Sequence, residues 1–310
     1  MENHQPRLTI GLPVYNGEEY LPAALDSLLG QTYTDFELII SDNASTDATP
    51  RICEAFARRD SRVRHVRQTV NIGAAENFNA VFRLAQSPYF KWAAHDDVLA
   101  PDFLEKTVAV LDGDPGIILA YSRVAQIDAG GQTVGTYDYP MRLNAPSPLT
   151  RFRDLVLVNH FCVAVFGVIR REALARTPLI GKFVGSDRTL LAELGLLGRL
   201  YEVPEYLFFR RDHPDTSGRK FNMYRRLAWY DPKKTGKLYF PYWRMGAEYL
   251  RAAFRAPLPP GDRLRAAGIV LRWYGLKRRQ LTEDVKAALV YRFPFLSSAA
   301  RSTAGVPRNG

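Results

Sequence analysis

The chain has little cysteine and no long apolar run, and both shortages limit the classes of protein to which it can belong. Its 310 residues include two cysteines, Cys53 and Cys162, which form neither a CxxC pair nor a zinc-finger spacing. We therefore expect buried free thiols in a reducing compartment. No apolar stretch is long enough to span a bilayer, and no basic-then-apolar leader begins the chain. These absences predict a cytoplasmic protein.

Acidic residues are scarce in the last ninety positions. The net charge is +10, yet residues 1–220 hold 24 Lys/Arg against 27 Asp/Glu, whereas residues 221–310 hold 18 against 5. A basic tail on a nearly neutral body indicates an anionic partner. Membrane lipid headgroups, a lipid-linked phosphate acceptor and nucleic acid are the candidates.

Several common functional motifs are missing as well. There is no GxxxxGK[ST] phosphate loop and no GxGxxG after a strand, which argues against P-loop ATPases and dinucleotide enzymes. There is no GxSxG nucleophile elbow. No helix-turn-helix, RNA-recognition or zinc motif supports nucleic acid as the partner of the tail, so we expect none.

Apolar strands and amphipathic helices alternate four times in the first 111 residues. This alternation predicts an α/β fold with a mostly parallel central sheet flanked by helices. The expected strands are Leu8–Leu12, stopped by Pro13, then Phe36–Ile40, Val63–Val66 and Tyr89–Ala93. The expected helices begin near Leu21, Thr46, Ala74 and Pro101.

The second half is less regular. The pattern there predicts a hairpin at 117–137, a proline-rich loop at 144–148, an apolar strand at 163–169 and a helix at 186–197 that begins at Ser186. Two short strands at 200–203 and 206–209 follow, and then basic aromatic helices at 221–310 with one break at 257–260. We predict one domain over residues 1–220 and a helical, basic extension over 221–310.

Three polar clusters follow the ends of predicted strands, which is where open α/β sheets bind ligands. They are Pro13–Asn16, Ser41–Asn43 and His95–Asp97. Asp96 and Asp97 are adjacent carboxylates that repel each other unless a cation or a donor compensates. A divalent metal on a diphosphate is one compensator, and a solvated turn with a helix cap is the alternative.

Four further groups carry two interpretations each. Asp42 suits the imide N–H of uracil or thymine, or belongs to a helix-capping cluster. The glycine of Asn71-Ile72-Gly73 permits close approach to a ligand, or only a positive φ. Asp187 begins a helix, where it caps or catalyses. Arg210, Arg211 and His213 suit phosphate or metal, or form a solvated turn.

Taken in order, these clusters resemble family 2 glycosyltransferases of the GT-A fold, from about Leu8 to Gly218. The most specific stretches are LPVYNGEEYL at residues 12–21, SLLGQTY at 27–33 and FELIISDNASTD at 36–47. The resemblance implies that the nucleotide is held by Pro13, Val14, Tyr15, Glu18, Asp42, Asn71, Gly73, Asn77 and Asp96. His95 departs from the three carboxylates that many members carry.

The resemblance also implies a reaction. Asp97 and His213 would hold Mn²⁺ or Mg²⁺, Arg210 and Arg211 would share the diphosphate charge, and Asp187 would be the catalytic base. The expected chemistry is inverting transfer from a nucleotide-diphosphate sugar, with UDP as the first and dTDP as the second carrier. The acceptor would be a glycan or lipid-linked hydroxyl in cell-surface polysaccharide synthesis, and the loop at 137–148 would cover it. A sugar-nucleotide-binding protein without transfer activity is the alternative.

Apolar and basic residues interleave in the tail, at Val270, Leu271, Trp273, Tyr274, Leu276 and Leu281 and at Arg272, Lys277, Arg278 and Arg279. This mixture is typical of an amphipathic helix at an anionic membrane surface, which would make the protein peripheral at the inner face of the cell membrane. A helix packed on the main domain with a solvated basic face explains the pattern equally well.

Overall fold

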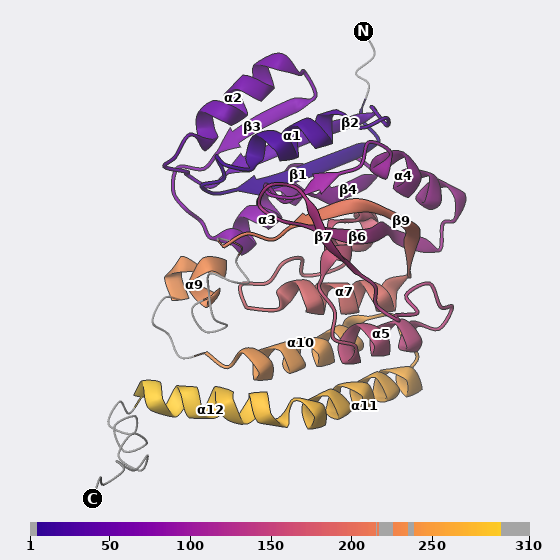
Figure 1. Cartoon of the computed structure of the whole chain (residues 1–310). Helices are drawn as coiled ribbons and strands as arrows, with labels where there is room; N and C mark the ends of the chain where they lie inside the picture. Colours follow the sequence, from indigo (N-terminus) through magenta and orange to yellow (C-terminus); the bar gives the residue numbers. More distant parts are fainter. Residues whose placement is uncertain (1–4, 215, 217–225, 235–238, 293–310) are drawn as a thin grey trace, which may run out of the picture.

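The structure is a computed structural model that describes residues 5–214, 216, 226–234 and 239–292. One sheet runs through the first two thirds of the chain, and helices cover it (Figure 1). The strands are β1 (Leu8–Val14), β2 (Phe36–Asp42), β3 (Val63–Arg67), β4 (Tyr89–Trp92), β5 (Val98–Leu99), β6 (Ile117–Ile127), β7 (Thr133–Tyr137), β8 (Val168–Arg170) and β9 (Arg199–Arg211).

The helices fall into two groups by the part of the chain that they follow. Those connecting the strands are α1 (Leu21–Leu29), α2 (Thr49–Arg59), α3 (Ala74–Leu84), α4 (Phe103–Gly113), α5 (Pro148–Leu157), the 3-10 helix η1 (Val163–Phe166), α6 (Arg171–Ala175) and α7 (Ser186–Leu197). Those after β9 are α9 (Arg226–Tyr230), η2 (Pro232–Lys234), α10 (Pro241–Arg255), α11 (Pro260–Leu276) and α12 (Arg278–Arg292).

The strand order is β3-β2-β1-β4-β8-β6-β9-β5, with β7 paired to β6. Strands β1 to β4 are parallel to their neighbours in this group, and β6 is parallel to β9. Strand β8 runs antiparallel between β4 and β6. The α/β architecture with a mostly parallel sheet is therefore confirmed. Because β2 and β4 lie on opposite sides of β1, the winding reverses at β1, and the crevice beyond its carboxyl end is the expected binding position.

Strand β1 does not stop at Pro13, as the sequence suggested, but continues through Val14. Ala93 donates its N–H to the carbonyl of Gly11, so this side of β1 faces β4. The backbone of Pro13 faces the same side, but β4 ends at Trp92 and so does not extend to the level of Pro13. The missing N–H of Pro13 therefore removes no hydrogen bond from the sheet.

Three other boundaries differ from the expectation. Helix α2 begins at Thr49 and not at Thr46, with a proline in its first turn, where a missing N–H is harmless. Residues 163–169 form η1 and then β8 and not a single strand. The two short strands at 200–209 are one strand, β9, whose pairing with β6 is irregular around Pro204.

Two apolar clusters pack on the two faces of the sheet. One lies under α1, α2 and α4. The other joins the sheet to α3, α5 and α7 and continues into α10 and α11. There Tyr249 of α10 contacts Trp273 of α11 edge to face, with the ring centroids 5.5 Å apart. Helix α10 therefore packs below α7, and α11 and α12 form a further layer along the lower side of the molecule (Figure 1).

The predicted division at residue 220 falls among residues 217–225, which are outside the described ranges, so it stays a prediction. Both cysteines are free thiols, Cys53 buried and Cys162 half-buried. In the part of the chain that the structure describes, no helix combines the length and the apolar character that crossing a bilayer requires.

Candidate active site

The polar clusters of the sequence lie together at one edge of the sheet. Val14, at the end of β1, is in register with Asp42 at the end of β2. The His95–Asp97 segment follows β4, the other neighbour of β1. Gly17 packs against His95 so closely that a Cβ at residue 17 would lie 2.5 Å from the imidazole. His95 is thus a packing surface for the loop after β1.

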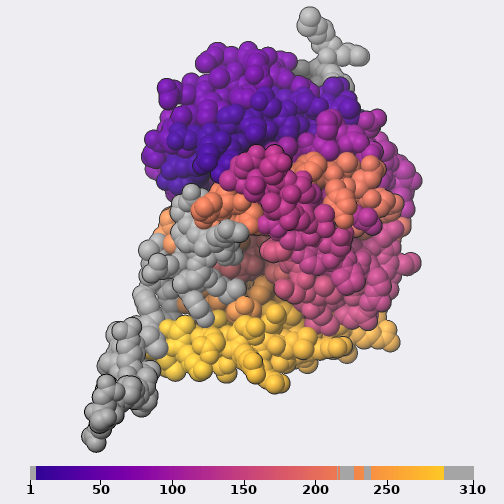
Figure 2. Space-filling view, viewed as in Figure 1, coloured from indigo at the N-terminus to yellow at the C-terminus, as the bar shows by residue number. Residues whose placement is uncertain are grey.

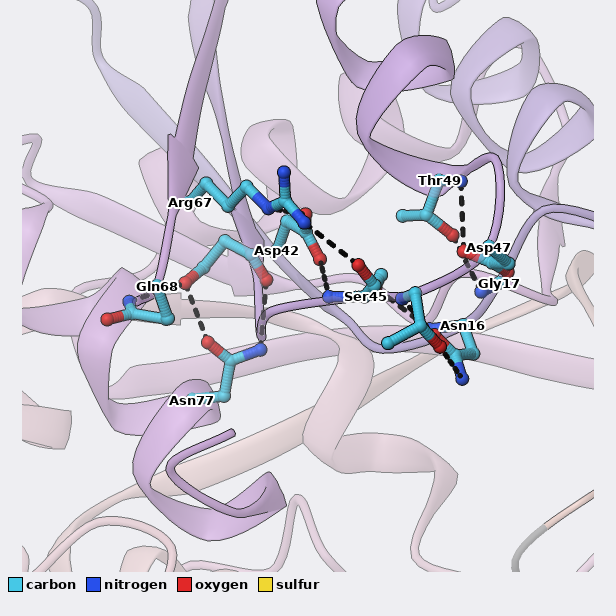
Figure 3. Close-up of polar contacts among 11 residues, drawn as sticks. Asn16, Gly17, Asp42, Ser45, Asp47, Thr49, Arg67, Gln68 and Asn77 are labelled. Carbon is cyan, nitrogen blue, oxygen red and sulfur yellow. Dashed lines mark hydrogen bonds and ion pairs between the residues drawn. The ribbon is translucent and has the colours of Figure 1, made fainter. Parts of the chain in front are cut away.

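The loop after β1 is tied to the loop after β2 by hydrogen bonds (Figure 3). The N–H of Asn16 donates to Ser45 Oγ at 2.9 Å, and the N–H of Gly17 donates to Thr49 Oγ1 at 2.9 Å. Asn16 Oδ1 accepts from the N–H of Thr46 at 2.9 Å. Ser45, Thr46 and Thr49 therefore hold the other loop in place, and of the three only Thr49 lies in α2, as its first residue.

The predicted nucleotide residues of the first loop differ in exposure. Pro13 and Val14 are buried, whereas the Tyr15 side chain is 43% exposed. Glu18 accepts a hydrogen bond from the N–H of Ala48 at 2.7 Å, just before α2. The Glu18 carboxylate is thus engaged in a hydrogen bond within the protein, whereas the Tyr15 side chain is exposed to solvent.

Asp42 is fully buried, which the sequence did not indicate. One carboxylate oxygen accepts from the N–H of Ser45 at 2.9 Å, and the other lies 3.3 Å from Arg67 Nε (Figure 3). Arg67 also donates to the carbonyl of Ser45 at 3.0 Å, yet its side chain is 53% exposed. A carboxylate covered by a half-exposed guanidinium therefore forms the floor of this end of the site.

The Asn71–Gly73 loop is attached to the same end. The Asn43 side chain donates to Asn71 Oδ1 at 3.0 Å and accepts from the N–H of Ile72 at 2.9 Å. Gly73 has φ +84°, so its positive φ is real. Asn77 is buried and donates to the carbonyl of Ser41 at 2.9 Å. Asn71 is exposed, and Asn77 supports the end of β2 from below.

Asp96 and Asp97 form two distinct contacts with the segment after β9. Asp97 Oδ1 accepts from the backbone N–H of Arg211 at 2.9 Å, and Asp96 Oδ2 lies 3.1 Å from His213 Nε2. Burial, and then the neighbouring charge of Asp96, raise the pKa of Asp97 to about 8. Burial acts to raise the pKa of Asp96 too, but His95 and His213 outweigh it and lower that pKa.

Arg211 and Arg210 have different surroundings. Arg211 is buried, donates to the carbonyl of Asp96 at 2.9 Å and lies 5.0 Å from the centre of the Tyr20 ring. Arg210 is half-buried, and its charge favours the ionised form of Asp97. Arg211 thus holds the acidic turn together, while Arg210 faces the site.

The donors of this group suit a divalent metal. Carboxylate oxygens and an imidazole nitrogen are ligands that Mn²⁺ accepts, and the raised pKa of Asp97 indicates a negative charge that lacks full compensation. Within the described ranges, no three His, Cys, Asp or Glu side chains are grouped to hold an ion. A metal on a diphosphate needs only one or two protein carboxylates, because phosphate oxygens complete its shell, so Asp97 with Asp96 or His213 fits.

Asp187 lies in the first turn of α7, after Gly185 with φ +85°. Its carboxylate contacts the thiol of Cys162 through a hydrogen bond. The next residue, Arg188, donates to the carbonyls of His160 at 2.6 Å and Val158 at 3.1 Å. The segment around residue 160 is thereby fixed beside Asp187.

Phe161 connects Asp187 to the acidic turn. Its side chain is 48% exposed, and its ring centre lies 4.7 Å from that of Tyr137 and 5.0 Å from the Arg210 guanidinium. Arg210 also donates to the Tyr137 hydroxyl at 3.0 Å. Because Cys162 is the next residue and contacts Asp187, this aromatic group bridges the Asp97 side and the Asp187 side of the site.

Sequence reasoning missed four residues here: Tyr20, Arg67, Lys91 and Phe161. Each acts through a partner distant in the chain, such as His213 for Tyr20, with ring centroids 4.5 Å apart. Lys91 is fully buried in β4, where its ammonium lies 4.8 Å from the Phe103 ring centre. A lysine inside an apolar strand was the one visible signal among them.

Comparisons with known proteins agree with this geometry. Residues 9–177 match the sequence profile described as glycosyl transferase family 2. Chondroitin synthase of Escherichia coli is 32% identical over 137 residues, which cover 44% of this chain and 20% of that protein. Glycosyltransferase GlyG of Streptococcus pneumoniae is 34% identical over 98 residues, 32% of this chain and 33% of that protein. The match thus spans a third or less of these relatives' length.

Solved structures support the fold. Residues 1–349 of TarS from S. aureus in complex with UDP superpose with a TM-score of 0.62 at 15% identity, covering 86% of this chain and 71% of that one. The mannosyltransferase PcManGT from Pyrobaculum calidifontis, in complex with GDP-Man and Mn²⁺, gives 0.51 at 19% identity, covering 94% and 88%. The profile covers more than half of the chain and the architecture agrees with it, so the protein belongs to glycosyl transferase family 2 and has the GT-A fold.

Proposed function

We propose that this protein transfers a sugar from a nucleotide-diphosphate donor to an acceptor hydroxyl, with inversion at the anomeric carbon. UDP is the first choice of carrier and dTDP the second. The acceptor is a glycan or a lipid-linked saccharide, and cell-surface polysaccharide synthesis is the process that we assign to it.

One observation carries the proposal. Arg210, whose charge acts on Asp97, lies 5.0 Å from the centre of the Phe161 ring, and the next residue, Cys162, interacts with Asp187. A group that handles a diphosphate and a group that can accept a proton therefore border the same region. Sugar transfer from a diphosphate needs these two capacities side by side.

The nucleobase of the donor is best matched at Asp42 and Arg67. Uracil and thymine each present an N–H between two carbonyls; the half-exposed Arg67 guanidinium offers donors to the carbonyls, and the buried Asp42 carboxylate becomes an acceptor for the N–H when Arg67 moves aside to meet the ligand. The two bases share this edge, so the pair does not separate UDP from dTDP. The TarS structure with UDP supports the first choice, and the mannosyltransferase structure with GDP-Man makes guanosine donors the natural comparison in a test.

The reaction divides between the two sides of the site. Asp187 takes the proton of the acceptor hydroxyl, as a carboxylate within hydrogen-bond reach can. Arg210 stabilises negative charge on the departing diphosphate, and Arg211 keeps the acidic turn in position through the carbonyl of Asp96. Asp97, with Asp96 or His213, holds the divalent metal, which supplies further charge neutralisation when bound.

The aromatic group at Phe161, Tyr137 and Tyr139 supports an acceptor position. Tyr137 and Tyr139 are nearly parallel, with an angle of 5° between their rings, and the Tyr139 hydroxyl accepts from the N–H of Phe161 at 3.0 Å. These contacts fix the rings before a ligand arrives, which reduces the entropy lost on binding. The half-exposed Phe161 ring offers a flat apolar surface to the C–H face of a sugar.

A thermal-shift screen with UDP, dTDP, GDP and ADP, each with and without Mn²⁺, tests donor class and metal together. A uridine or thymidine nucleotide should give the largest shift, and Mn²⁺ should increase it. NMR of the product from the corresponding sugar nucleotide then reports inversion. Nucleotide binding without donor hydrolysis or transfer would favour the alternative of a binding protein, for which His95 in place of an acid is the only argument.

A further inference from the structure

The outer face of α11 and α12 carries leucines and arginines in place of a purely polar surface. On α11, Ala266, Val270 and Trp273 are buried toward α10 and α5. Leu264 and Leu271, seven residues apart, are 69% and 66% exposed on another side of the helix. A helix packed on a domain normally presents charged and polar residues to water, so this exposed apolar row needs an explanation.

Further apolar side chains are exposed along the same layer. Leu276, at the end of α11, is 61% exposed, and Val285 and Leu289 of α12 are 41% and 46% exposed. The two helices lie end to end at the edge of the molecule, and both pack on α10 (Figures 1 and 2). On α11, Leu264 and Leu271 lie roughly opposite the buried Ala266, Val270 and Trp273, so they point away from α10, and the exposed apolar side chains of α12 lie further along the same layer.

Basic residues border this apolar row. Arg265 and Arg272 directly follow the two exposed leucines of α11, and Arg278 and Arg279 begin α12. The acids of the face are already balanced, because Asp262 pairs with Arg265 at 3.0 Å and Glu283 with Lys286 at 2.8 Å. Among the described residues, no carboxylate lies within ion-pair distance of Arg272, Arg278 or Arg279. The face therefore has an excess of positive charge.

We propose that this face, defined by Leu264, Leu271 and Leu276 with Arg265, Arg272, Arg278 and Arg279, docks on an anionic lipid bilayer. The leucines would enter the boundary between headgroups and acyl chains, and the arginines would contact lipid phosphates. A second copy of the chain is disfavoured, because its arginines would meet these arginines. Nucleic acid is disfavoured, because it would leave the leucines in water.

The burial of Trp273 and Val270 refines the expectation from the sequence. The two explanations of the tail, packing on the main domain and contact with a membrane, each hold for a different side of α11. Removing the tail would uncover core residues such as Phe152 of α5, whose ring packs edge to face on Tyr249 of α10, so a truncated chain would not test the docking face. Substitutions of exposed residues in the full chain are the appropriate variants.

Flotation of the full chain with vesicles tests the proposal and does not depend on sugar transfer. The vesicles are phosphatidylcholine with or without about 30% phosphatidylglycerol. The buffer has physiological ionic strength, at which the Debye length is about 8 Å. The protein should float with the anionic vesicles and stay behind with the neutral ones. Leu264→Asn with Leu271→Asn, and separately Arg265→Gln with Arg272→Gln, should each weaken binding roughly tenfold or more.

Matched controls use the same chemistry elsewhere. Arg51→Gln with Arg58→Gln removes two exposed arginines that are also seven residues apart, on α2, and Val70→Asn with Val134→Asn changes two exposed apolar residues. Both controls should float like the wild type, and all variants should melt within a few degrees of it. Absence of flotation with anionic vesicles, or equal flotation of the α11 variants, overturns the proposal. So does a dimer in solution that the leucine variant separates.

Discussion

Asp97 and Arg211 are 114 residues apart in the chain, yet the Asp97 carboxylate accepts the backbone N–H of Arg211 at 2.9 Å. This hydrogen bond fastens the acidic turn after β4 to the end of β9. It leaves the second carboxylate oxygen of Asp97 available to another ligand, while His213, two residues beyond Arg211, contacts Asp96. The end of β9 thus closes the acidic turn from the side opposite β1.

The first prediction concerns the metal at this turn. Asp97→Asn keeps the acceptor for Arg211 but removes the negative charge, so the added stabilisation of the nucleotide complex by Mn²⁺ should disappear. Thermal shifts with UDP, with and without Mn²⁺, measure it. Asp212→Asn is the matched control, because Asp212 bonds Gln126 at 2.7 Å instead. A Mn²⁺-dependent shift that survives in Asp97→Asn would remove this residue as a ligand.

The second prediction concerns the catalytic base. Asp187→Asn should reduce transfer by roughly a hundredfold to ten-thousandfold, because a general base contributes on that order. Donor affinity, measured by calorimetry with the sugar nucleotide, should stay within about twofold. If transfer by Asp187→Asn approaches that of the wild type, another group takes the proton.

How much of this site the sequence predicts depends on the distance between partners in the chain. Strand ends such as Asp42 and Asp97 were predictable, because apolar strands end where polar clusters begin and parallel strands end at one edge. Arg67 over Asp42 was not, because the contact depends on the register of β3 against β2. The packing of Trp273 was not either, because an aromatic residue among arginines fits a buried or an exposed side equally well.

The fold shows the same limit. Alternating apolar and helical patterns predicted β1 to β4 and their helices, but residues 163–169 are apolar throughout and contain no period that separates a 3-10 turn from a strand. Gly167 decides the conformation there, since a Cβ would lie 2.5 Å from the carbonyl of Ala120. That close approach is a tertiary contact, and no local pattern encodes it.

The third prediction concerns the acceptor. Phe161→Ala should raise the KM for the acceptor roughly tenfold, because the sugar loses its apolar surface, and should leave donor hydrolysis by water nearly unchanged. Phe161→Tyr keeps the ring and should behave like the wild type. Equal losses of hydrolysis and transfer in Phe161→Ala would mean that the ring serves the donor or the fold and not the acceptor.

The fourth prediction concerns the loop beside the nucleotide site. Gly73 has φ +84°, and a Cβ there would lie 2.7 Å from the carbonyl oxygen of Tyr230 in α9. Gly73→Ala should therefore lower the free energy of unfolding by at least about 2 kcal/mol. Gly113→Ala is the control, because nothing lies within 4 Å of its added Cβ, and it should change stability by about 1 kcal/mol or less. Chemical denaturation measures both, and equal stability of the two variants would contradict the strained contact.

The last prediction uses the buried lysine of β4. Burial lowers the pKa of Lys91 to about 7 from its ordinary 10.5, although the nearby charge of Asp97 opposes the shift. The unfolded chain therefore binds the proton first as the pH falls from 10.5 toward 7, and the lysine lowers stability progressively over that window. A methionine of similar length at residue 91 escapes this penalty but leaves the carbonyl of Phe166, a hydrogen-bond partner of Lys91, without its donor.

We expect Lys91→Met to be more stable than the wild type by about 2 kcal/mol at pH 7, since each pKa unit is worth about 1.4 kcal/mol and the lost hydrogen bond offsets part of the gain. The advantage should shrink as the pH rises toward 10.5, where the lysine is neutral in both states. Urea denaturation at pH 7, 8.5 and 10 measures this difference. A constant or growing advantage would mean that Lys91 keeps its proton in the folded protein, held by Phe166 and the rings around it.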